Sequence, residues 1–249
     1  MPSHRALFSS DWNQCLAPCG PFDCLAYHHP QLQPELEVVF KQYTGNRIPL
    51  GEAARRIGAI LPAPLSEAQM DAYLEKSFAV YRGVPELIEW CASERILFMI
   101  NTTGTIGYFQ RVFALGLLPP VPVLSAHPMI RYPRAKTDPG VIYELHETTD
   151  KGPNTEQARQ RAGIAPDRVI VMGDSGGDGP HFAWAARTGA RRVGSMTKAS
   201  LSSYCRGEKI GIDVHFGPVY AVGEKADSWR EMQVDFRNLI PDIKRLLGC

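Results

Sequence analysis

The chain of 249 residues lacks the sequence features of a membrane, secreted or nucleic-acid-binding protein. No segment approaches the roughly 18 consecutive apolar residues that a membrane span requires. The N-terminal stretch MPSHRALFSSDW contains no long apolar segment, so it does not resemble a signal peptide and we expect a cytoplasmic protein. The formal net charge is only +1, so no broad field would attract nucleic acid or an anionic membrane. Any anion must therefore be bound by a local group of side chains.

The sequence also lacks the regular cysteine spacing of a disulfide framework or a structural zinc site. Its six cysteines are scattered, and without a secretion signal their expected state is the reduced thiol. One cluster, in which Cys15, Cys19 and Cys24 are followed by His28 and His29, leaves a zinc site as an alternative. Because the cluster lacks the closely paired cysteines of such sites, free thiols are the favoured interpretation.

What the sequence does contain is an alternation of apolar runs and amphipathic segments. Residues 5–10 and the runs RILFMI, VPVLSA, DRVIVMGD and ARRVGSM are predicted to be strands. Helical patterns lie between them, in VPELIEWCASE, IGYFQRVFALG, NTEQARQRAG and DGPHFAWAARTG. We expect Asn154 to cap the third helix, residues 127–146 to be irregular, and Pro241 to interrupt a C-terminal helix. The alternation predicts an α/β fold with a Rossmann-like parallel sheet covered by helices.

Residues 17–82 differ in character from the rest of the chain. They contain amphipathic stretches at helical spacing, PELEVVFKQYTG and PLGEAARRIGAIL, followed by PLSEAQMDAYLEKSFAVY. In the last stretch Ser66 precedes Gln69 in the arrangement of a capping box, which marks the start of a helix. The pattern predicts a small helical cap domain at 17–82, inserted into an α/β core of residues 1–16 and 83–249.

Polar clusters follow the predicted strands and indicate where the chemistry lies. Asp11 follows the first strand, residues 101–103 (NTT) follow the second, and Asp174 and Asp178 follow a later one. Ligands of parallel sheets bind at the carboxyl ends of the strands. A phosphate ester requires an in-line nucleophile and positive charge to offset its oxygens, which Asp11 and Lys151 can supply. Carboxylates and phosphate repel, and Mg²⁺, which prefers oxygen ligands, is the cation expected between them.

Taken in order, these residues resemble the motifs of the haloacid dehalogenase-like hydrolase superfamily over nearly the whole chain. DWNQCL matches its first motif in part, FMINTTG its second, Lys151 its third, and VMGDSGGD its fourth in full. The helical segment after the first motif is similar to the cap of the branch that contains phosphoserine phosphatase, and the enolase-phosphate phosphatases are a further likeness. Lys136 is a rival for the third motif, but Lys151 directly precedes a predicted helix.

The resemblance implies a role for each matching residue. Asp11 would form an aspartyl-phosphate, and Mg²⁺ would be held by Asp11, the backbone carbonyl of Asn13, and Asp174. Asp178 would be a further ligand, direct or through water, or would orient Lys151. Lys151 would also neutralise a phosphate oxygen.

The second motif and the cap leave the phosphate-binding and substrate-binding residues open. Thr102 and Thr103 are the predicted phosphate-binding residues, with Asn101 as the other possibility for the hydroxyl position. The cap would close over the substrate and exclude water. Its candidates for substrate contact are Tyr27, His28, His29, Arg55 and Arg56.

Asn13 is the position where the sequence departs from the superfamily pattern. The superfamily has an aspartate there that protonates the leaving alcohol and then activates water. An amide cannot exchange a proton at neutral pH, and loss of a general acid/base typically costs about 10²–10⁴-fold in rate.

Asn13 therefore leaves several hypotheses about function open. The leading one is a Mg²⁺-dependent phosphatase of a small phosphorylated metabolite; one form of it acts on acidic leaving groups, which need no proton. The alternatives are a weakly active or inactive protein that binds a phosphorylated ligand, a phosphonatase- or dehalogenase-type hydrolase, and a deliberate exchange of the acid to trap substrate. The dehalogenase branch fits less well, because the intact acidic loop implies a metal. The sequence names neither the substrate nor the oligomeric state.

Overall fold

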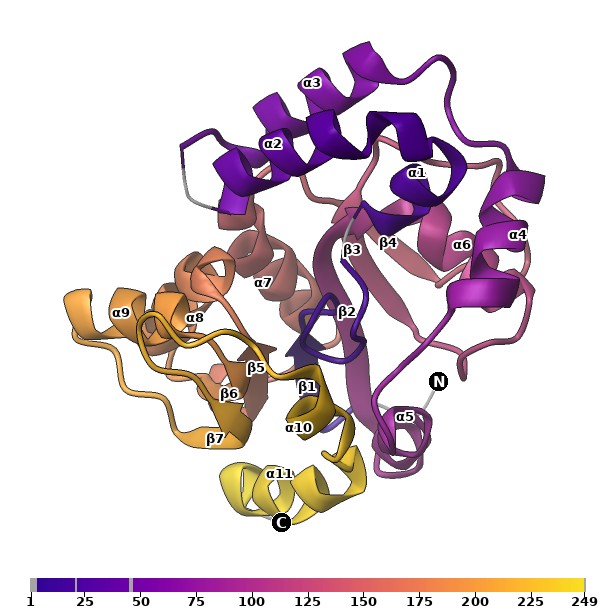
Figure 1. Ribbon diagram of the computed structural model, residues 1–249. Coiled ribbons are helices and arrows are strands. Elements are labelled where there is room, and N and C mark those ends of the chain that lie inside the picture. The colour runs from indigo at the N-terminus through magenta and orange to yellow at the C-terminus, as the bar shows by residue number, and fades with distance from the viewer. Residues whose placement is uncertain (1–3, 21, 45–46, 249) are drawn as a thin grey trace.

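A computed structural model describes residues 4–20, 22–44 and 47–248, and a seven-stranded sheet forms its centre. The strand order is β4-β3-β2-β1-β5-β6-β7, and every pair is parallel. This confirms the predicted fold class (Figure 1). The strands are β1 (Ala6–Ser10), β2 (Ile96–Thr105), β3 (Val123–His127), β4 (Val141–Glu144), β5 (Val169–Gly173), β6 (Arg191–Thr197) and β7 (Val214–Val219).

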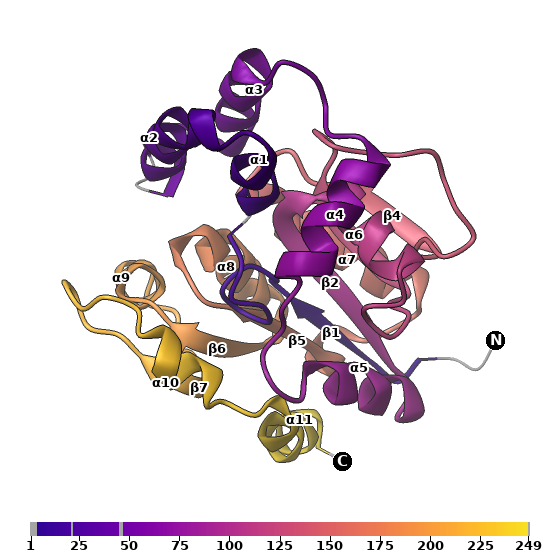
Figure 2. The ribbon, with the colours of Figure 1, turned by 45° about the vertical axis from the view of Figure 1, so that its right-hand side comes forward.

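Helices cover both faces of the sheet because its central strands are apolar on both sides. Alternate residues of β1 and β2 point to opposite faces: Phe8 and Phe98 belong to one apolar cluster, Leu7 and Leu97 to the other. One face packs against α5 (Val84–Ser93), α6 (Ile106–Ala114) and α11 (Ile240–Leu247). The other packs against α7 (Lys151–Arg161), α8 (Gly179–Thr188) and α9 (Ala199–Gly207). Figure 2 shows α5 and α11 together on one side of the sheet.

Four helices lie between β1 and α5 in the chain and form a group of their own. They are α1 (Asp23–His28), α2 (Gln33–Thr44), α3 (Leu50–Ile60) and α4 (Glu67–Ser77). Figure 1 shows them gathered above one end of the sheet, and they are called the cap helices below. The capping box predicted at the start of α4 is confirmed: Ser66 Oγ accepts from the Gln69 amide, and the Gln69 side chain accepts from the Ser66 amide at 2.9 Å. The cap boundary at 17–82 stays a prediction.

Two salt-bridged contacts join the cap helices to the α/β core. Arg111 of α6 binds Asp71 at 2.7 Å and Glu67 at 2.6 Å, both on α4. At the other end of the cap, the Glu147 carboxylate accepts hydrogen bonds from the Leu50 and Gly51 amides, each at 2.9 Å. The cap is thus anchored to the core at α4 and at the first turn of α3.

Three local predictions were wrong, and each has a physical reason. Helix α7 begins at Lys151, because Asn154 is buried within it and donates instead to Ser125 and to the Glu144 carbonyl, both at 2.9 Å. The stretch expected to be irregular contains β4, a short and only partly buried strand. Pro241 lies in the first turn of α11 and begins that helix, since the missing amide hydrogen is not needed there.

The remaining elements are short. They are α10 (Ser228–Met232) and the 3₁₀ turns Pro30–Leu32, Thr148–Asp150, Pro166–Arg168, Gly176–Asp178 and Phe236–Leu239. None of the described helices is long and apolar enough to span a membrane.

Candidate active site

The order of the strands brings the predicted site residues together at the carboxyl ends of neighbouring strands. Strand β1 lies between β2 and β5, so their carboxyl ends are neighbours. Asp11 follows β1, and its amide donates to the Met172 carbonyl of β5 at 2.9 Å. Asp174 follows β5, and Asp178 ends the next turn. Ligand oxygens of Asp11, Asp174 and Asp178 lie within 4.8 Å of one another, as a metal site requires.

Burial and mutual repulsion shape the ionisation of this acidic cluster. All three aspartates are buried, with exposed fractions of 7% or less. Burial raises the pKa of Asp11 and raises that of Asp174 to about 7. Burial also acts on Asp178, but the charge of Lys151 and its hydrogen bond outweigh it and lower the pKa of Asp178. The cluster therefore needs positive charge to stay ionised.

Lys151 supplies part of that charge. Its Nζ lies 3.0 Å from Asp11 Oδ1 and 2.6 Å from Asp178 Oδ1, and its side chain is only 2% exposed. The second oxygen of Asp178 accepts from the amides of Asp174 at 2.9 Å and Ser175 at 3.2 Å. These contacts favour Asp178 as the residue that orients Lys151 and shapes the acidic loop. The rival Lys136 lies exposed in the segment before β4.

A second lysine, Lys198, was not predicted. Its Nζ lies 2.6 Å from Asp174 Oδ2 and also donates to the side chain of Gln14. Lys198 directly follows β6, whose end lies beside that of β5. A lysine two residues after the predicted strand ARRVGSM was the available signal. The site thus carries an ammonium for Asp174 as well as one for Asp11.

Both polar atoms of the Asn13 side chain are hydrogen-bonded to other residues of the protein. Its Oδ1 accepts from the Thr102 hydroxyl at 3.0 Å, and its Nδ2 donates to the Cys19 carbonyl at 3.2 Å. The Thr102 oxygen in turn accepts from the Gly104 amide at 3.1 Å. Asn13 therefore links the end of β2 to the segment that leads into the cap helices.

The residues predicted to bind phosphate divide into three environments. Thr102 is fully buried and its hydroxyl is engaged by Asn13. Asn101 is fully buried too, and its amide donates to Ser9, Thr155 and the Lys151 carbonyl, within the packing between β2 and α7. Thr103 lines the pocket described next, so the geometry favours Thr103 for contact with a phosphate oxygen.

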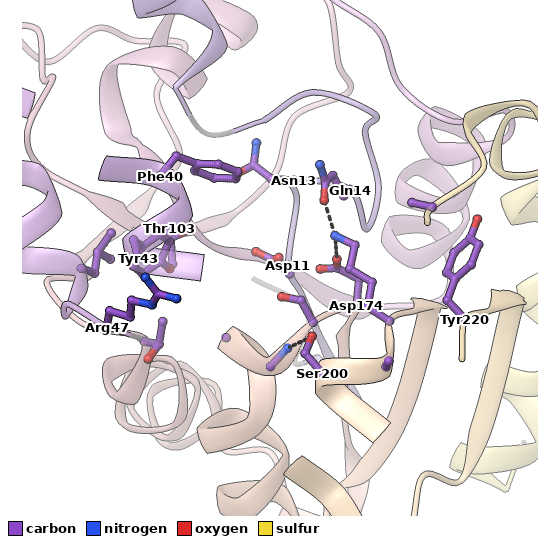
Figure 3. A pocket seen from close by; sticks show the side chains of 18 of the residues that line it. Asp11, Asn13, Gln14, Phe40, Tyr43, Arg47, Thr103, Asp174, Ser200 and Tyr220 are labelled. Atoms are coloured by element: carbon purple, nitrogen blue, oxygen red, sulfur yellow. Dashed lines mark hydrogen bonds and ion pairs between the residues drawn. The ribbon is translucent and has the colours of Figure 1, made fainter. Parts of the chain in front are cut away.

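A pocket of about 1050 Å³ opens over Asp11 and Asp174. Figure 3 shows Tyr43 and Arg47 gathered near Thr103 on one side of Asp11, with Tyr220 on the other side, beyond Asp174. The Tyr43 hydroxyl is hydrogen-bonded to the Thr103 side chain, and burial raises the pKa of Tyr43 to about 12. The cap side of the pocket consists of Phe40, Tyr43, Arg47, Ile48, Pro49 and Leu50.

None of the five predicted cap residues lines this pocket. Arg55 and Arg56 bind Glu52 on their own helix, and His28 contacts the Gln69 carbonyl. Tyr27 lines a separate, shallower cavity. The cap residues that do reach the pocket include Phe40 and Tyr43, whose spacing of three places them on one face of α2, and Arg47, which follows that helix.

The cysteine cluster forms no metal site within the described part of the chain. The group of potential ligands found there consists of the three aspartates. Cys15 and Cys24 are buried free thiols, Cys19 is a partly exposed one, and burial raises the pKa of Cys19 to about 11 and that of Cys24 to about 12.

Known structures share this fold and its arrangement, although no known family model and no curated protein sequence matches the chain. A phosphoserine phosphatase solved as a phospho-aspartyl intermediate analogue matches with a TM-score of 0.65 at 15% identity, over 97% of this chain and 100% of that one. A substrate-bound phosphoserine phosphatase matches with a TM-score of 0.65 at 14% identity, over 96% and 99%. A haloacid dehalogenase (HAD) family hydrolase from Salmonella enterica serovar Typhi matches with a TM-score of 0.61 at 14% identity, over 85% and 68%.

These likenesses define the class of fold. The chain has the fold of the haloacid dehalogenase-like hydrolases, as its motifs predicted. Within that class its arrangement is that of the phosphoserine phosphatases, with which it aligns almost from end to end.

Proposed function

We propose that the protein is a Mg²⁺-dependent phosphatase that hydrolyses a small phosphorylated metabolite through an aspartyl-phosphate on Asp11. The observation that carries this proposal is the position of Asp11 at the floor of the pocket, 3.0 Å from the Lys151 ammonium and beside two further carboxylates. The similar structure with a phospho-aspartyl intermediate analogue supports the same chemistry on the same fold.

The donor set suits a hard divalent cation. Three buried carboxylates within 4.8 Å repel one another, and two lysines leave one negative charge uncompensated. Mg²⁺ takes oxygen ligands of this kind together with water and phosphate oxygens. Asp11, Asp174 and the Asn13 carbonyl would hold the ion, with Asp178 as a further or water-mediated ligand. Bound there, the cation would offset the negative charge of the phosphate and allow the carboxylate to approach it.

The chain's own residues would then carry the transfer. A carboxylate oxygen of Asp11 attacks phosphorus while the ester P–O bond breaks, and the leaving oxygen departs with the electron pair. Lys151 keeps Asp11 ionised and stabilises the equatorial oxygens, and Thr103 offers a hydroxyl to one of them. Water then attacks the phosphorus of the aspartyl-phosphate, which releases phosphate and restores Asp11. The cap helices would exclude bulk water in the first step.

A panel of phosphorylated metabolites tests the proposal. The purified protein should release phosphate from at least one compound with Mg²⁺, and lose that activity with chelator. Acid-stable trapping of ³²P on Asp11, mapped by mass spectrometry, should identify the intermediate. The absence of both turnover and labelling across the panel would contradict the proposal.

Asn13 favours one alternative, a protein that binds a phosphorylated ligand with little turnover. Its amide cannot deliver the proton that an alkoxide leaving group requires. Tight Mg²⁺-dependent binding of a phosphorylated compound by calorimetry, without phosphate release, would support this alternative. Cleavage of a phosphorus–carbon or carbon–halogen bond in the same panel would instead support a phosphonatase- or dehalogenase-type hydrolase.

A further inference from the structure

The side chain of Asn13 is occupied on both of its polar atoms. Its oxygen accepts from Thr102 and its nitrogen donates to the Cys19 carbonyl. A neutral amide has no proton to transfer to a leaving group, and these two contacts hold it in the framework of the site. If a proton reaches the leaving group, another residue of the pocket must supply it.

The carboxyl groups that line the pocket all accept from a lysine or a backbone amide of the protein. Asp11 faces Lys151 at 3.0 Å, and Asp174 faces Lys198 at 2.6 Å. Glu147 accepts from two backbone amides of α3 at 2.9 Å each. Glu224 accepts from the Ala221 amide at 2.9 Å. Each of these carboxyl groups is thus engaged by a donor of the protein, and none is free to replace the missing carboxyl group at position 13.

Lys198 and Tyr220 also line the pocket, and both are engaged: Lys198 pairs with Asp174, and the Tyr220 hydroxyl donates to Glu231 at 3.0 Å. No histidine is among the described residues that line the pocket. Tyr43 is the phenol nearest to Thr103, but burial raises its pKa to about 12, far above the operating pH at which a general acid is effective. The carboxyl, lysine and tyrosine side chains that line the described pocket are thus engaged by other residues, and Asn13 supplies no proton donor beside Asp11.

The cap side of the pocket shows what kind of leaving group fits there. Phe40, Tyr43 and Ile48 give the cap side of the pocket an apolar wall, with Arg47 beside it, and Figure 3 shows Phe40 and Tyr43 across from Asp174. The pocket volume of about 1050 Å³ exceeds what a small polar alcohol such as serine would fill. Phosphate at the floor would direct its ester group toward this apolar wall.

We infer that the substrate is an aryl phosphate, whose phenolic oxygen leaves as a stable anion and whose ring packs against the apolar cap wall. This inference rests on the proposed phosphatase function and narrows its substrate class. Asp11 forms the new P–O bond as the aryl–oxygen bond to phosphorus breaks, and the phenoxide takes its proton from water after release. No residue needs to protonate it, because a phenol is roughly five orders of magnitude more acidic than an alkyl alcohol, with a pKa near the ~10 of tyrosine.

The lack of a carboxyl group at Asn13 also affects the second step, the hydrolysis of the aspartyl-phosphate. Attack of water on the aspartyl-phosphate normally benefits from a general base, and Asn13 cannot serve as one. Aryl phosphates should therefore give a burst of phenol equal to the enzyme concentration, followed by slower steady-state turnover.

A leaving-group series tests the inference on the unmodified protein. We would measure kcat/KM with Mg²⁺ for substituted phenyl phosphates, phenyl phosphate, phosphoserine and glycerol phosphate. The value should fall steeply as the leaving group becomes less acidic, by at least about 100-fold from phenyl phosphate to the alkyl esters. Alkyl esters cleaved as well as phenyl phosphate would overturn the inference and leave the phosphatase proposal intact. Failure to cleave any ester, together with no labelling of Asp11, would instead defeat the proposed function itself.

Two variants sharpen this test. Asn13→Asp should raise kcat/KM for alkyl phosphates by about 10²–10⁴-fold while changing nitrophenyl phosphate little, because the new carboxyl group can protonate an alkoxide. Its second oxygen would face the Cys19 carbonyl, which favours the protonated form. Phe40→Ala should raise KM for phenyl phosphate several-fold and leave KM for glycerol phosphate unchanged. Equal effects of Phe40→Ala on both esters would contradict the aryl assignment.

Discussion

The α/β core and the cap helices use charge in opposite ways. In the core, Lys151 is buried against Asp11 and Asp178 at 3.0 and 2.6 Å, where the removal of charges from water is costly. In the cap, Glu52 pairs with Arg55 and Arg56 on the surface of α3, where side chains remain largely in water. Surface pairs of this kind contribute little to stability. The core therefore retains a buried ion-pair network, despite the cost of removing its charges from water, because the site uses those charges. The charged residues of the cap mainly keep its outer face in contact with water.

The largest expected effect comes from removing the nucleophile. Asp11→Asn should lower kcat by at least about 10³-fold on any substrate that the protein turns over, because an amide cannot form the aspartyl-phosphate. Steady-state phosphate release measures it. Glu52→Gln in the cap is the matched control and should leave kcat unchanged. A residual rate within tenfold of wild type would show that Asp11 is not the nucleophile.

The next effect concerns stability. Lys151→Met leaves Asp11 and Asp178 buried without their ammonium, and breaking a buried pair in this way typically costs about 3–5 kcal/mol. Urea denaturation in the presence of chelator should show the loss as a lower midpoint. Arg55→Met, which removes an exposed cap pair, should leave the midpoint unchanged. A similar midpoint for both variants would remove the contrast between core and cap.

The buried histidine His181 predicts a dependence of the stability of the core on pH. Burial lowers the pKa of His181 to about 3, and its Nε2 contacts Thr155 at 2.9 Å. Because the folded pKa lies below the unfolded value of about 6.5, the unfolded chain binds more protons between these values. The stabilisation is present above pH 6.5 and is lost as the pH falls toward 3, at about 1.4 kcal/mol per pH unit.

The difference in stability between wild type and His181→Gln isolates the contribution of His181. The raised pKa of Asp174 contributes with the opposite sign, since the folded state binds the additional proton below about pH 7. That contribution is common to wild type and His181→Gln. Between pH 6.5 and 5, wild type should lose about 2 kcal/mol relative to His181→Gln in urea denaturation. A constant difference over this range would show that His181 does not remain neutral in the folded protein.

Lys198 allows the metal site to be tested by binding measurements that do not depend on enzymatic activity. Its ammonium occupies Asp174 Oδ2 at 2.6 Å, so a cation that binds Asp174 must displace it. Lys198→Met should therefore tighten Mg²⁺ binding by about tenfold in calorimetry, a gain of about 1.4 kcal/mol. Lys41→Met, which removes an exposed cap lysine, should not change the affinity. Weaker binding by Lys198→Met would indicate that the lysine supports the metal site.

The sequence predicted the parts of this molecule that depend on local pattern and order. Continuous apolar runs located β1, β2 and β5, and the Ser66 capping box located the start of α4. Asp11, Lys151 and Asp174 were predicted because each follows or precedes a recognisable element. Strand β4 was missed because it is short and only partly buried, so it carries no apolar run.

Residues that act across long separations could not be predicted in the same way. Lys198 reaches Asp174 only because β6 lies beside β5, and Glu147 meets α3 only because the cap folds back over the core. Nothing in the sequence near either residue indicates its partner. Phe40 and Tyr43 did carry a helical spacing, but only the orientation of α2 distinguishes their face from the one with Arg55 and Arg56 on α3.

The smallest effect should come from Glu147, where core and cap meet. Its carboxylate accepts the Leu50 and Gly51 amides at 2.9 Å each, and a negative charge at the first turn of a helix is favourable. Glu147→Gln keeps one oxygen acceptor and loses the charge, so it should cost about 1 kcal/mol of cap attachment.

If the cap must lie over the pocket to bind substrate, this loss should appear as a rise in KM of about fivefold with little change in kcat, because the weakened contact lies between the cap and core. Faster limited proteolysis within residues 50–60 should accompany it. Glu144→Gln, which removes an exposed carboxylate of β4 three residues away, is the matched control and should leave both measurements unchanged. An unchanged KM with faster proteolysis would mean that this contact stabilises the cap without governing access to the pocket, and that the acidic floor alone determines substrate affinity.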